Sequence, residues 1–394
     1  MNQFNPVEPL NLGYMNILLD AIPLGGLMTG ISRYLRSLYL QLERLPGVSV
    51  YYFNGRSLTK QMPDQTRPDF WIKTTSFVDK FPDPLIFGFR AAAWLSYEYK
   101  IRRRIWNGSF SVYHETAFTP SAIKNVPQVF TIYDLSLTKF RELHPKERVW
   151  FSDIFLKNRL GYAKHIITIS DFVRSEICDE LHLPPEKVTA IPLAPDPFFF
   201  PRKRGKAEVV VKALGLPRDY ILFVGTLEPR KNLPILIKAA AVCESDIPIV
   251  LVGWEGWGSE EWLEKVKDQG LQNRIFTTGY VDEESLACLY SNALALVFPS
   301  LYEGFGLPVL EAMSCGCPVI CSDAASLPEV AGNAALLIDP AEFEDLAVGI
   351  DKILSDSALR TDLIQKGFER AAQFSWERIA RQTLEVFRSV VDQG

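Results

Sequence analysis

Two glutamates flank a glycine-containing turn in the segment Leu301-Tyr-Glu-Gly-Phe-Gly-Leu-Pro-Val-Leu-Glu-Ala-Met313. Glu303 precedes the turn and Glu311 follows it, and neither has a cation beside it in the sequence. Pro308 suits the first turn of a helix, so the turn should present free backbone N–H groups and the positive end of a helix dipole to an anion such as a diphosphate. The turn consists of Gly304, Phe305, Gly306 and Leu307.

A basic pair, Arg230 and Lys231, lies shortly after Gly225 in the segment Gly225-Thr-Leu-Glu-Pro-Arg-Lys-Asn232. Gly225 ends an apolar strand pattern, and ligands of parallel sheets bind at the carboxyl ends of the strands. We therefore expect the pair to form a charge-assisted clamp on an anion, although a solvated charge pair would show the same sequence.

Strand patterns alternate with helical stretches in both halves of the chain, as is typical of parallel sheets. The predicted strands of the first half are Met15–Asp20, Val48–Phe53, Ser111–His114, Gln128–Tyr133 and His165–Ile169. Those of the second half are Tyr220–Gly225, Ile247–Gly253, Ile275–Thr278, Ala293–Phe298, Pro318–Cys321 and Ala334–Ile338. Helices are expected at Ile31–Leu45, after an N-cap at Ser170, and from the capping residue Ser375 to Val391.

The pattern predicts an α/β protein with two Rossmann-like, doubly wound domains. We place the N-terminal domain at residues 1–200 and the C-terminal domain at residues 201–374, because a proline-containing linker at Val188–Pro197 closes the first series of strands. The loop with Gly25 and Gly26 follows the first strand. It matches neither a P-loop nor the dinucleotide fingerprint, so we expect its glycines to let the backbone approach a ligand closely, and we assign Gly25 and Gly26 to donor binding.

The composition of the chain agrees with two globular domains. It has 394 residues, of which 47% are hydrophobic, and its net charge of -5 gives no overall attraction to nucleic acid. No apolar run is long enough for a membrane-spanning helix, and no secretory signal precedes the cysteines, so we expect reduced thiols in a cytoplasmic protein. Cys315, Cys317 and Cys321 could form part of a zinc site, but they lack a Cys-x-x-Cys pair and run into an apolar strand pattern.

These motifs, in this order and spacing, resemble the retaining GT-B glycosyltransferases of family 4 (glycosyl transferases group 1), and the resemblance covers nearly the whole chain. It implies two domains facing each other across a cleft, with the C-terminal domain binding a nucleotide sugar and a last helix, at about residues 375–394, packing back on the N-terminal domain. Trp376 would mark the crossover. The N-terminal half looks most like bacterial mannosyltransferases of surface-polysaccharide assembly.

The resemblance also assigns roles in the donor site. Glu303 would contact the donor sugar and Glu311 the ribose hydroxyls, so we expect neither glutamate to need a cation partner. Arg230 and Lys231 would neutralise the diphosphate. Backbone groups of Gly279, Tyr280 and Val281 would meet the base.

The candidates for the acceptor side come from two segments of the N-terminal half. Tyr133 stands where the family often has histidine, which argues against proton transfer there, and Asp134 beside it is a candidate for orienting the acceptor. His114 and Glu115 follow a predicted strand and are further candidates; the alternative is a structural histidine and a capping glutamate. Retention is generally explained by front-face attack, in which the leaving phosphate accepts the proton and no protein base is needed.

The cluster from Glu98 to Trp106 combines cations with aromatic and aliphatic residues. A helix lying on an anionic membrane would have this composition, and so would a solvated helix face.

The sequence therefore predicts a cytoplasmic glycosyltransferase that moves a hexose to a hydroxyl of a glycan or lipid-linked glycan. If the cluster from Glu98 to Trp106 contacts a membrane, the protein acts at the inner face of that membrane. Our best choice of donor is GDP-mannose, although nothing in the base-contacting segments decides guanine against uracil. The sequence contains no Asp-x-Asp, so we expect neither a metal nor a cofactor beyond the donor. The alternatives are a catalytically silent member of the family and a nucleotide-sugar-binding protein.

Overall fold

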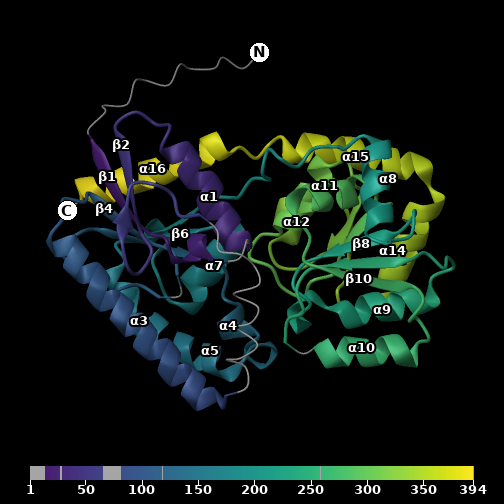
Figure 1. Ribbon diagram of the computed structural model, residues 1–394, viewed down its shortest axis with the longest axis horizontal. Coiled ribbons are helices and arrows are strands. Elements are labelled where there is room, and N and C mark those ends of the chain that lie inside the picture. Colours follow the sequence, from purple (N-terminus) through teal and green to yellow (C-terminus); the bar gives the residue numbers. More distant parts are fainter. Residues whose placement is uncertain (1–13, 27–28, 65–80, 118, 258, 394) are drawn as a thin grey trace. The chain divides into compact units, whose positions relative to one another are not determined.

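The computed structural model describes residues 14–26, 29–64, 81–117, 119–257 and 259–393. Leu27 and Met28 of the predicted glycine loop lie outside these residues. The chain divides into two compact units, the first with residues 1–131, 154–166 and 380–394 and the second with residues 132–153 and 167–379. It forms two sheets of mainly parallel strands, each with helices on both faces, which confirms the predicted pair of Rossmann-like domains (Figure 1). The boundaries that we placed at residues 200 and 374 stay a prediction.

The first sheet has seven strands in the order β3-β2-β1-β4-β5-β6-β7. They are β1 (Met15–Asp20), β2 (Val48–Phe53), β3 (Leu58–Thr59), β4 (Val112–Glu115), β5 (Gln128–Ile132), β6 (His165–Thr168) and β7 (Val188–Ala190). Strand β3 runs antiparallel to β2. Strand β7 falls in the segment that we assigned to a linker, and that assignment is wrong for its first three residues, because Val188 is buried and the strand completes the edge of the sheet.

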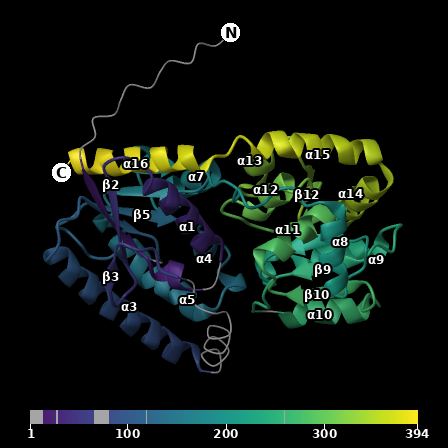
Figure 2. The same ribbon diagram turned by 45° about the horizontal axis from the view of Figure 1, so that its top comes forward.

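Helices cover the two faces of the first sheet. On one face, α3 (Asp83–Trp106) packs Tyr97 and Ile101 against Tyr113 of β4. Because successive strand residues point to opposite faces, His114 lies on the other face. There it contacts α1 (Gly30–Leu42) and α16 (Trp376–Asp392), and Figure 2 shows α3 and α16 on opposite sides of the sheet.

The second sheet has six strands in the order β10-β9-β8-β11-β12-β13, and each strand pairs in parallel with its neighbours. They are β8 (Ile221–Val224), β9 (Ile249–Val252), β10 (Ile275–Gly279), β11 (Ala295–Phe298), β12 (Val319–Ser322) and β13 (Leu336–Ile338). Apolar side chains of α9 (Leu233–Val242), α10 (Ser259–Asp268) and α14 (Phe343–Ser355) form a core with one face of this sheet. Figure 1 shows α11 (Glu283–Asn292), α12 (Leu307–Ser314) and α15 (Ser357–Ala371) on the other face.

Shorter helices fill the connections. They are α4 (Ser136–Lys139), α5 (Lys146–Phe151), α6 (Lys157–Arg159), α7 (Asp171–Glu180), α8 (Arg204–Ala213) and α13 (Leu327–Ala331). The predicted cap of α7 is confirmed, because the Ser170 side chain accepts a hydrogen bond from the Val173 amide at 3.2 Å.

Candidate active site

The strand order of the second sheet reverses between β8 and β11. From β8 the chain proceeds to β9 and β10 on one side, whereas β11 leads to β12 and β13 on the other. A crevice forms at such a switch point outside the carboxyl ends of the two strands, and ligands of doubly wound sheets bind there. The segments that leave β8 and β11 at this point are the two that the sequence analysis singled out, Gly225–Asn232 and Leu301–Met313.

The segment after β8 forms a short 3-10 helix, Pro229–Lys231, that returns the Lys231 side chain over Gly225. Gly225 has a φ of 149°, and a Cβ built on it would lie 3.5 Å from Cε of Lys231. Lys231 Nζ also lies 4.9 Å from the ring centroid of Phe298, the last residue of β11. The ammonium group is thus held above the ends of both central strands.

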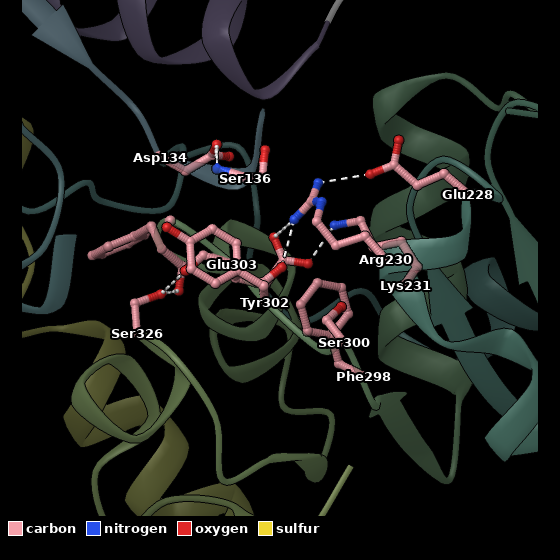
Figure 3. A network of polar contacts seen from close by, with 12 residues as sticks. Asp134, Ser136, Glu228, Arg230, Lys231, Phe298, Ser300, Tyr302, Glu303 and Ser326 are labelled. Carbon is pink, nitrogen blue, oxygen red and sulfur yellow. Dashed lines mark hydrogen bonds and ion pairs between the residues drawn. The ribbon is translucent and has the colours of Figure 1, made fainter. Parts of the chain in front are cut away.

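Glu303 lies between the two cations (Figure 3). Its Oε1 is 2.6 Å from Nζ of Lys231, and its Oε2 is 3.2 Å from Nη1 of Arg230. Our expectation that neither glutamate needs a cation partner is therefore wrong for Glu303. Its partner Lys231 is 72 residues away in the sequence and Arg230 one more, and only the pairing of β8 with β11 brings them together.

The electrostatics of Glu303 follow from this position. Burial by itself would raise the pKa of the carboxyl group, but the charges of Lys231 and Arg230 outweigh burial and lower the pKa to about 2. The same attraction acts on the cation: burial would lower the pKa of Arg230, and Glu303 raises it above its ordinary value. Glu303 and Arg230 therefore stay charged at neutral pH.

Arg230 has a second carboxylate partner that the sequence analysis missed. Its Nη2 lies 2.7 Å from Oε1 of Glu228, and its Nη1 donates a 2.6 Å hydrogen bond to the carbonyl oxygen of Tyr302. Glu228 stands within the quoted segment after Gly225, two residues before Arg230, so its proximity in sequence was the available signal. The cluster of Glu228, Arg230, Lys231 and Glu303 is neutral overall.

The predicted turn packs tightly before α12. A Cβ on Gly304 would lie 2.1 Å from the carbonyl oxygen of Tyr133, so only glycine fits there. Gly306 caps the helix with a φ of 107°, which glycine adopts without strain. Ser326 Oγ donates to the carbonyl oxygens of Glu303 and Phe305, at 2.9 and 3.0 Å, which fixes the turn from the side opposite the cations.

Helix α12 begins with Leu307 and has Pro308 in its first turn, as predicted. The first backbone N–H groups of a helix have no intrahelical acceptor and can bind an anion. Glu311, one turn later, is buried, and Tyr290 donates a 3.1 Å hydrogen bond to its Oε2. The structure thus places Glu303, the helix N-terminus and Glu311 along a single short segment.

The predicted base-contacting residues lie at the end of β10, which β9 and β8 separate from β11. Gly279 has a φ of 68°, and Tyr280 and Val281 are half-buried. The ring of Tyr280 stacks on that of Trp254, with centroids 5.1 Å apart and planes inclined by 18°. Trp254 follows β9 and was missed, since a single tryptophan after a strand carries no motif.

Asp134 lies just past β5 and belongs to the second unit. It is half-buried, and its Oδ1 accepts a 2.9 Å hydrogen bond from the Ser136 amide. The next backbone amide, that of Leu135, donates to the hydroxyl of Tyr302, the residue before Glu303, at 3.1 Å. The two segments are thus linked by direct hydrogen bonding within one unit.

The other acceptor-side candidates belong to the first unit. His114 is fully buried as part of β4 rather than following it, with Nδ1 2.7 Å from the Tyr39 hydroxyl and Nε2 2.7 Å from Thr131 Oγ1. Burial lowers its pKa to about 3, and this environment favours the structural alternative. Glu115 ends the same strand and is equally buried. Gly25 and Gly26, which we assigned to donor binding, also belong to the first unit and are half-buried after β1.

The described residues contain neither a metal-binding cluster nor a membrane-spanning helix. Among the described residues, no group of three His, Cys, Asp or Glu side chains is placed to hold a metal ion. Within the same part of the chain, none of the helices has the length and apolar character needed to cross a bilayer. Cys315, Cys317 and Cys321 are buried free thiols.

Family models and known proteins resemble the chain over most of its length. The model "Glycosyl transferases group 1" matches residues 208–370, and "Glycosyltransferase Family 4" matches residues 28–197. The O-antigen chain mannosyltransferase B of Escherichia coli is 33% identical over 387 residues, covering 95% of this chain and 100% of that protein. The MMP alpha-(1->4)-mannosyltransferase of Mycolicibacterium hassiacum is 29% identical over 89% of this chain and 86% of its own length.

Solved structures resemble the fold. Sucrose-phosphate synthase from Thermosynechococcus elongatus superposes with a TM-score of 0.75 at 23% identity, covering 96% of this chain and 100% of that one. WaaG, a glycosyltransferase involved in lipopolysaccharide biosynthesis, gives a TM-score of 0.70 at 14% identity, with coverage of 95% and 99%.

Proposed function

Because the chain belongs to glycosyltransferase family 4 and has the GT-B fold, it is a glycosyltransferase, and we propose that it transfers mannose from GDP-mannose to a hydroxyl of a glycan or lipid-linked glycan. The similarity to an O-antigen mannosyltransferase along the whole chain supports the choice of sugar and the kind of acceptor. The observation that carries the proposal is the position of Arg230, Lys231 and Glu303 at the switch point of the second sheet.

In the proposed reaction, the bond between the anomeric carbon and the diphosphate oxygen breaks. Arg230, Lys231 and the N-terminus of α12 stabilise the charge that develops on the leaving diphosphate. These groups supply the positive charge that a divalent ion would otherwise provide, so we propose that the reaction needs neither a metal nor a cofactor. Glu303 holds the donor sugar and Glu311 the ribose hydroxyls.

We propose that the anomeric configuration is retained. The acceptor oxygen attacks the face from which the diphosphate leaves, and the acceptor proton passes to the leaving phosphate. No protein base is needed in this scheme, so Tyr133 in place of a histidine does not prevent it. Asp134 orients the acceptor hydroxyl.

The test is a transfer assay with GDP-mannose, UDP-glucose and ADP-glucose, each with and without a mannose-terminated glycan. We expect nucleoside diphosphate to be released from GDP-mannose only when the glycan is present, with no loss of rate in EDTA. NMR of the new linkage should show the α configuration of the donor; the β anomer would refute retention. Nucleotide binding without acceptor-dependent release of nucleoside diphosphate would favour the catalytically silent family member. Release of nucleoside diphosphate from UDP-glucose alone would show that UDP-glucose, and not GDP-mannose, is the donor.

A second proposal concerns an anionic membrane surface, which α3 would contact from the cytoplasmic side. Leu85, Phe89, Tyr99 and Trp106 are exposed on this helix, by 51%, 68%, 62% and 78%. Their spacing places them along one outward stripe of the helix. Exposed Lys100, Arg103 and Arg104 flank the end of the stripe, whereas Arg102 is 2.6 Å from Glu98. Exposed aromatic rings beside basic side chains fit a lipid surface that carries negative charge.

Flotation with liposomes tests this surface. We expect binding that rises with the fraction of anionic lipid and that is lost in a Phe89→Ser/Trp106→Ser variant and weakened in Arg103→Ser/Arg104→Ser. A Lys265→Ser/Lys267→Ser variant removes the same charge from α10 and serves as the matched control. Equal flotation with neutral and anionic liposomes would overturn the proposal.

A further inference from the structure

The first sheet also reverses its strand order, and two carboxyl groups lie at the reversal. The sheet runs from β1 to β2 and β3 on one side and from β4 to β5, β6 and β7 on the other. Asp20 is the last residue of β1 and Glu115 the last residue of β4, and these strands pair in parallel. Both side chains have no exposed surface. Two acids thus occupy the switch point at which a doubly wound domain binds its ligand.

Hydroxyl groups surround the two carboxyl groups. Tyr97 of α3 donates a 2.8 Å hydrogen bond to Oδ1 of Asp20, and Tyr113 of β4 donates one of 2.7 Å to Oε2 of Glu115. Ser121 Oγ also donates to that oxygen, at 2.8 Å. Among the described residues neither carboxyl group has a cation as a partner, in contrast to Glu303.

One carboxyl oxygen lacks a donor in this arrangement. Oδ2 of Asp20 is buried and receives no hydrogen bond from the described residues, although the two carboxyl groups are within hydrogen-bonding reach of each other. Two ionised carboxylates in contact within a protein interior repel each other and are strongly disfavoured. A single proton between the two acids removes the repulsion and supplies the missing donor.

The same two residues hold the loops that leave their strands. Oδ1 of Asp20 accepts a 3.2 Å hydrogen bond from the Ile22 amide, at the start of the 3-10 helix Ile22–Gly25. After β4, Thr116 Oγ1 donates to the carbonyl oxygen of Asp20 at 2.9 Å, and the Ala117 amide donates to Oε1 of Glu115 at 3.4 Å. The pair therefore ties the loop with Gly25 to the loop after β4.

We propose that Asp20 and Glu115 share one proton at neutral pH and act as positioning residues that hold these two loops in place for the acceptor. This inference rests on the proposed transferase function for the identity of the ligand. The shared proton itself does not depend on that function.

The expected pH dependence follows from burial. Burial raises the pKa of Glu115 well above its ordinary value, the Asp20 charge raises it further, and burial also raises the pKa of Asp20. The titratable groups that face the pair are the hydroxyls of Tyr97 and Tyr113, whose own pKa values burial raises, so they stay neutral. A carboxyl group with a raised pKa in the folded state binds a proton that the unfolded chain has released. The free energy of unfolding must then fall as pH rises from the ordinary carboxyl pKa to the raised one.

Glu115→Gln is the informative substitution. Its amide can donate to Oδ2 of Asp20 as the proton does, keeps the same net charge as the shared pair, and cannot be deprotonated. The matched control is Glu98→Gln, because Glu98 is also buried in the first unit and also accepts from a loop amide, that of Ala122, but pairs with Arg159 at 2.8 Å.

Three measurements test the proposal. The infrared difference between wild type and Glu115→Gln at neutral pH should show the carbonyl band of a protonated carboxyl group, and the control should show none. Above about pH 6.5, beyond the range in which His114 titrates, thermal stability should fall with rising pH in wild type and in the control but stay flat in Glu115→Gln. The KM for acceptor should rise at alkaline pH by about tenfold or more in wild type but not in Glu115→Gln, while the Kd for GDP stays constant.

The outcomes separate this proposal from the proposed function. Absence of the protonated band, or parallel pH curves for wild type and Glu115→Gln, would overturn the shared proton even if transfer is observed. If KM for acceptor and Kd for GDP change together, the pair stabilises the fold without positioning the acceptor. If no transfer occurs with any donor, the proposed function fails, and the infrared and stability results still decide the shared proton.

Discussion

At the scale of single residues, the main finding is that Glu303 neutralises the two cations that the proposed reaction assigns to the diphosphate. A diphosphate that reaches Arg230 and Lys231 must compete with this carboxylate. When the diphosphate displaces Glu303 from the two cations, the sugar attached to the diphosphate lies beside the released carboxylate. The same side chain can thus stand in for the phosphate before binding and hold the sugar afterwards.

Glu303→Gln should separate these two roles. The amide keeps the shape of the side chain but not the charge, so we expect GDP to bind at least as tightly as in wild type while kcat falls by about 100-fold or more. Calorimetric titration with GDP and the transfer assay measure the two effects. Glu228→Gln is the matched control, because it removes the other carboxylate partner of Arg230; it should retain most of the activity. Weaker binding of GDP to Glu303→Gln would contradict the prediction.

His114 should make the first unit sensitive to acid. Burial lowers its pKa from 6.5 to about 3, so between these values the unfolded chain binds a proton that the folded chain does not. The contribution of His114 to the free energy of unfolding should therefore fall as pH drops through this range, by about 1.4 kcal/mol per pH unit, while Asp20 and Glu115 contribute with the opposite sign in its upper part. Urea denaturation at a series of pH values checks this, and His114→Gln should show a smaller slope. Identical slopes would show that His114 does not titrate as its burial implies.

The sequence predicted the charged and glycine residues of the proposed donor site, since the motifs that carry them are local. Arg230, Lys231 and Glu303 lie in the segments that leave β8 and β11, and Glu311 lies in α12. It could not show that Glu303 pairs with Lys231, because that contact depends on which strand lies beside β8. For the same reason the sequence placed His114 and Glu115 on the acceptor side without revealing that both are buried in the first sheet.

At the scale of elements, the turn before α12 has almost no room for side chains. The carbonyl oxygen of Tyr133 would lie 2.1 Å from a Cβ on Gly304, and Ser170 Oγ donates to the Gly304 carbonyl oxygen at 2.8 Å. The turn that carries Glu303 is therefore fixed by the backbone of the segment after β5 and by the cap of α7.

Gly304→Ala should consequently destabilise the protein and displace Glu303. A backbone clash of this kind cannot be relieved by a side-chain rotation, so we expect a loss of about 2–4 kcal/mol, measured by urea denaturation, together with weaker GDP binding. Gly349→Ala in α14 is the matched control, because its Cβ would meet Ile320 and Ile338 at ordinary contact distances of 3.7 Å. Similar stability of the two variants would show that the turn can move.

The elements themselves were predicted well where the apolar patterns are long. The eleven strands predicted from sequence each contain or overlap an observed strand. The two that were missed, β3 and β7, have two and three residues and lie at the edges of the first sheet. Pairing with a neighbouring strand stabilises such short edges, and so short a run cannot show periodicity in a sequence.

At the scale of the whole molecule, Arg230, Lys231, Glu303 and Glu311 of the proposed donor site lie in one unit, and Asp20, Glu115, Gly25 and Gly26 lie in the other. A ligand that binds the native state raises its stability by mass action, by about 2.7 kcal/mol at a concentration of 100 times Kd. We expect GDP and GDP-mannose to raise Tm, whereas UDP and ADP at the same concentration raise it less. Glu311→Ala should abolish the shift, because it removes the proposed ribose contact. An equal rise in Tm with all nucleotides would show that the protein does not distinguish the bases, and it would refute GDP-mannose as the specific donor.

The strand order of the second sheet has a consequence for how the protein matures. Lys231 and Glu303 are 72 residues apart, and their segments meet only where β8 pairs with β11, although β9 and β10 are synthesised between them. Contacts of such long range form late, because the intervening chain must first be ordered. A chain still emerging from the ribosome therefore has its basic pair long before it has the carboxylate that balances it. The ion pair between Lys231 and Glu303 therefore forms only once this half of the chain has assembled its sheet.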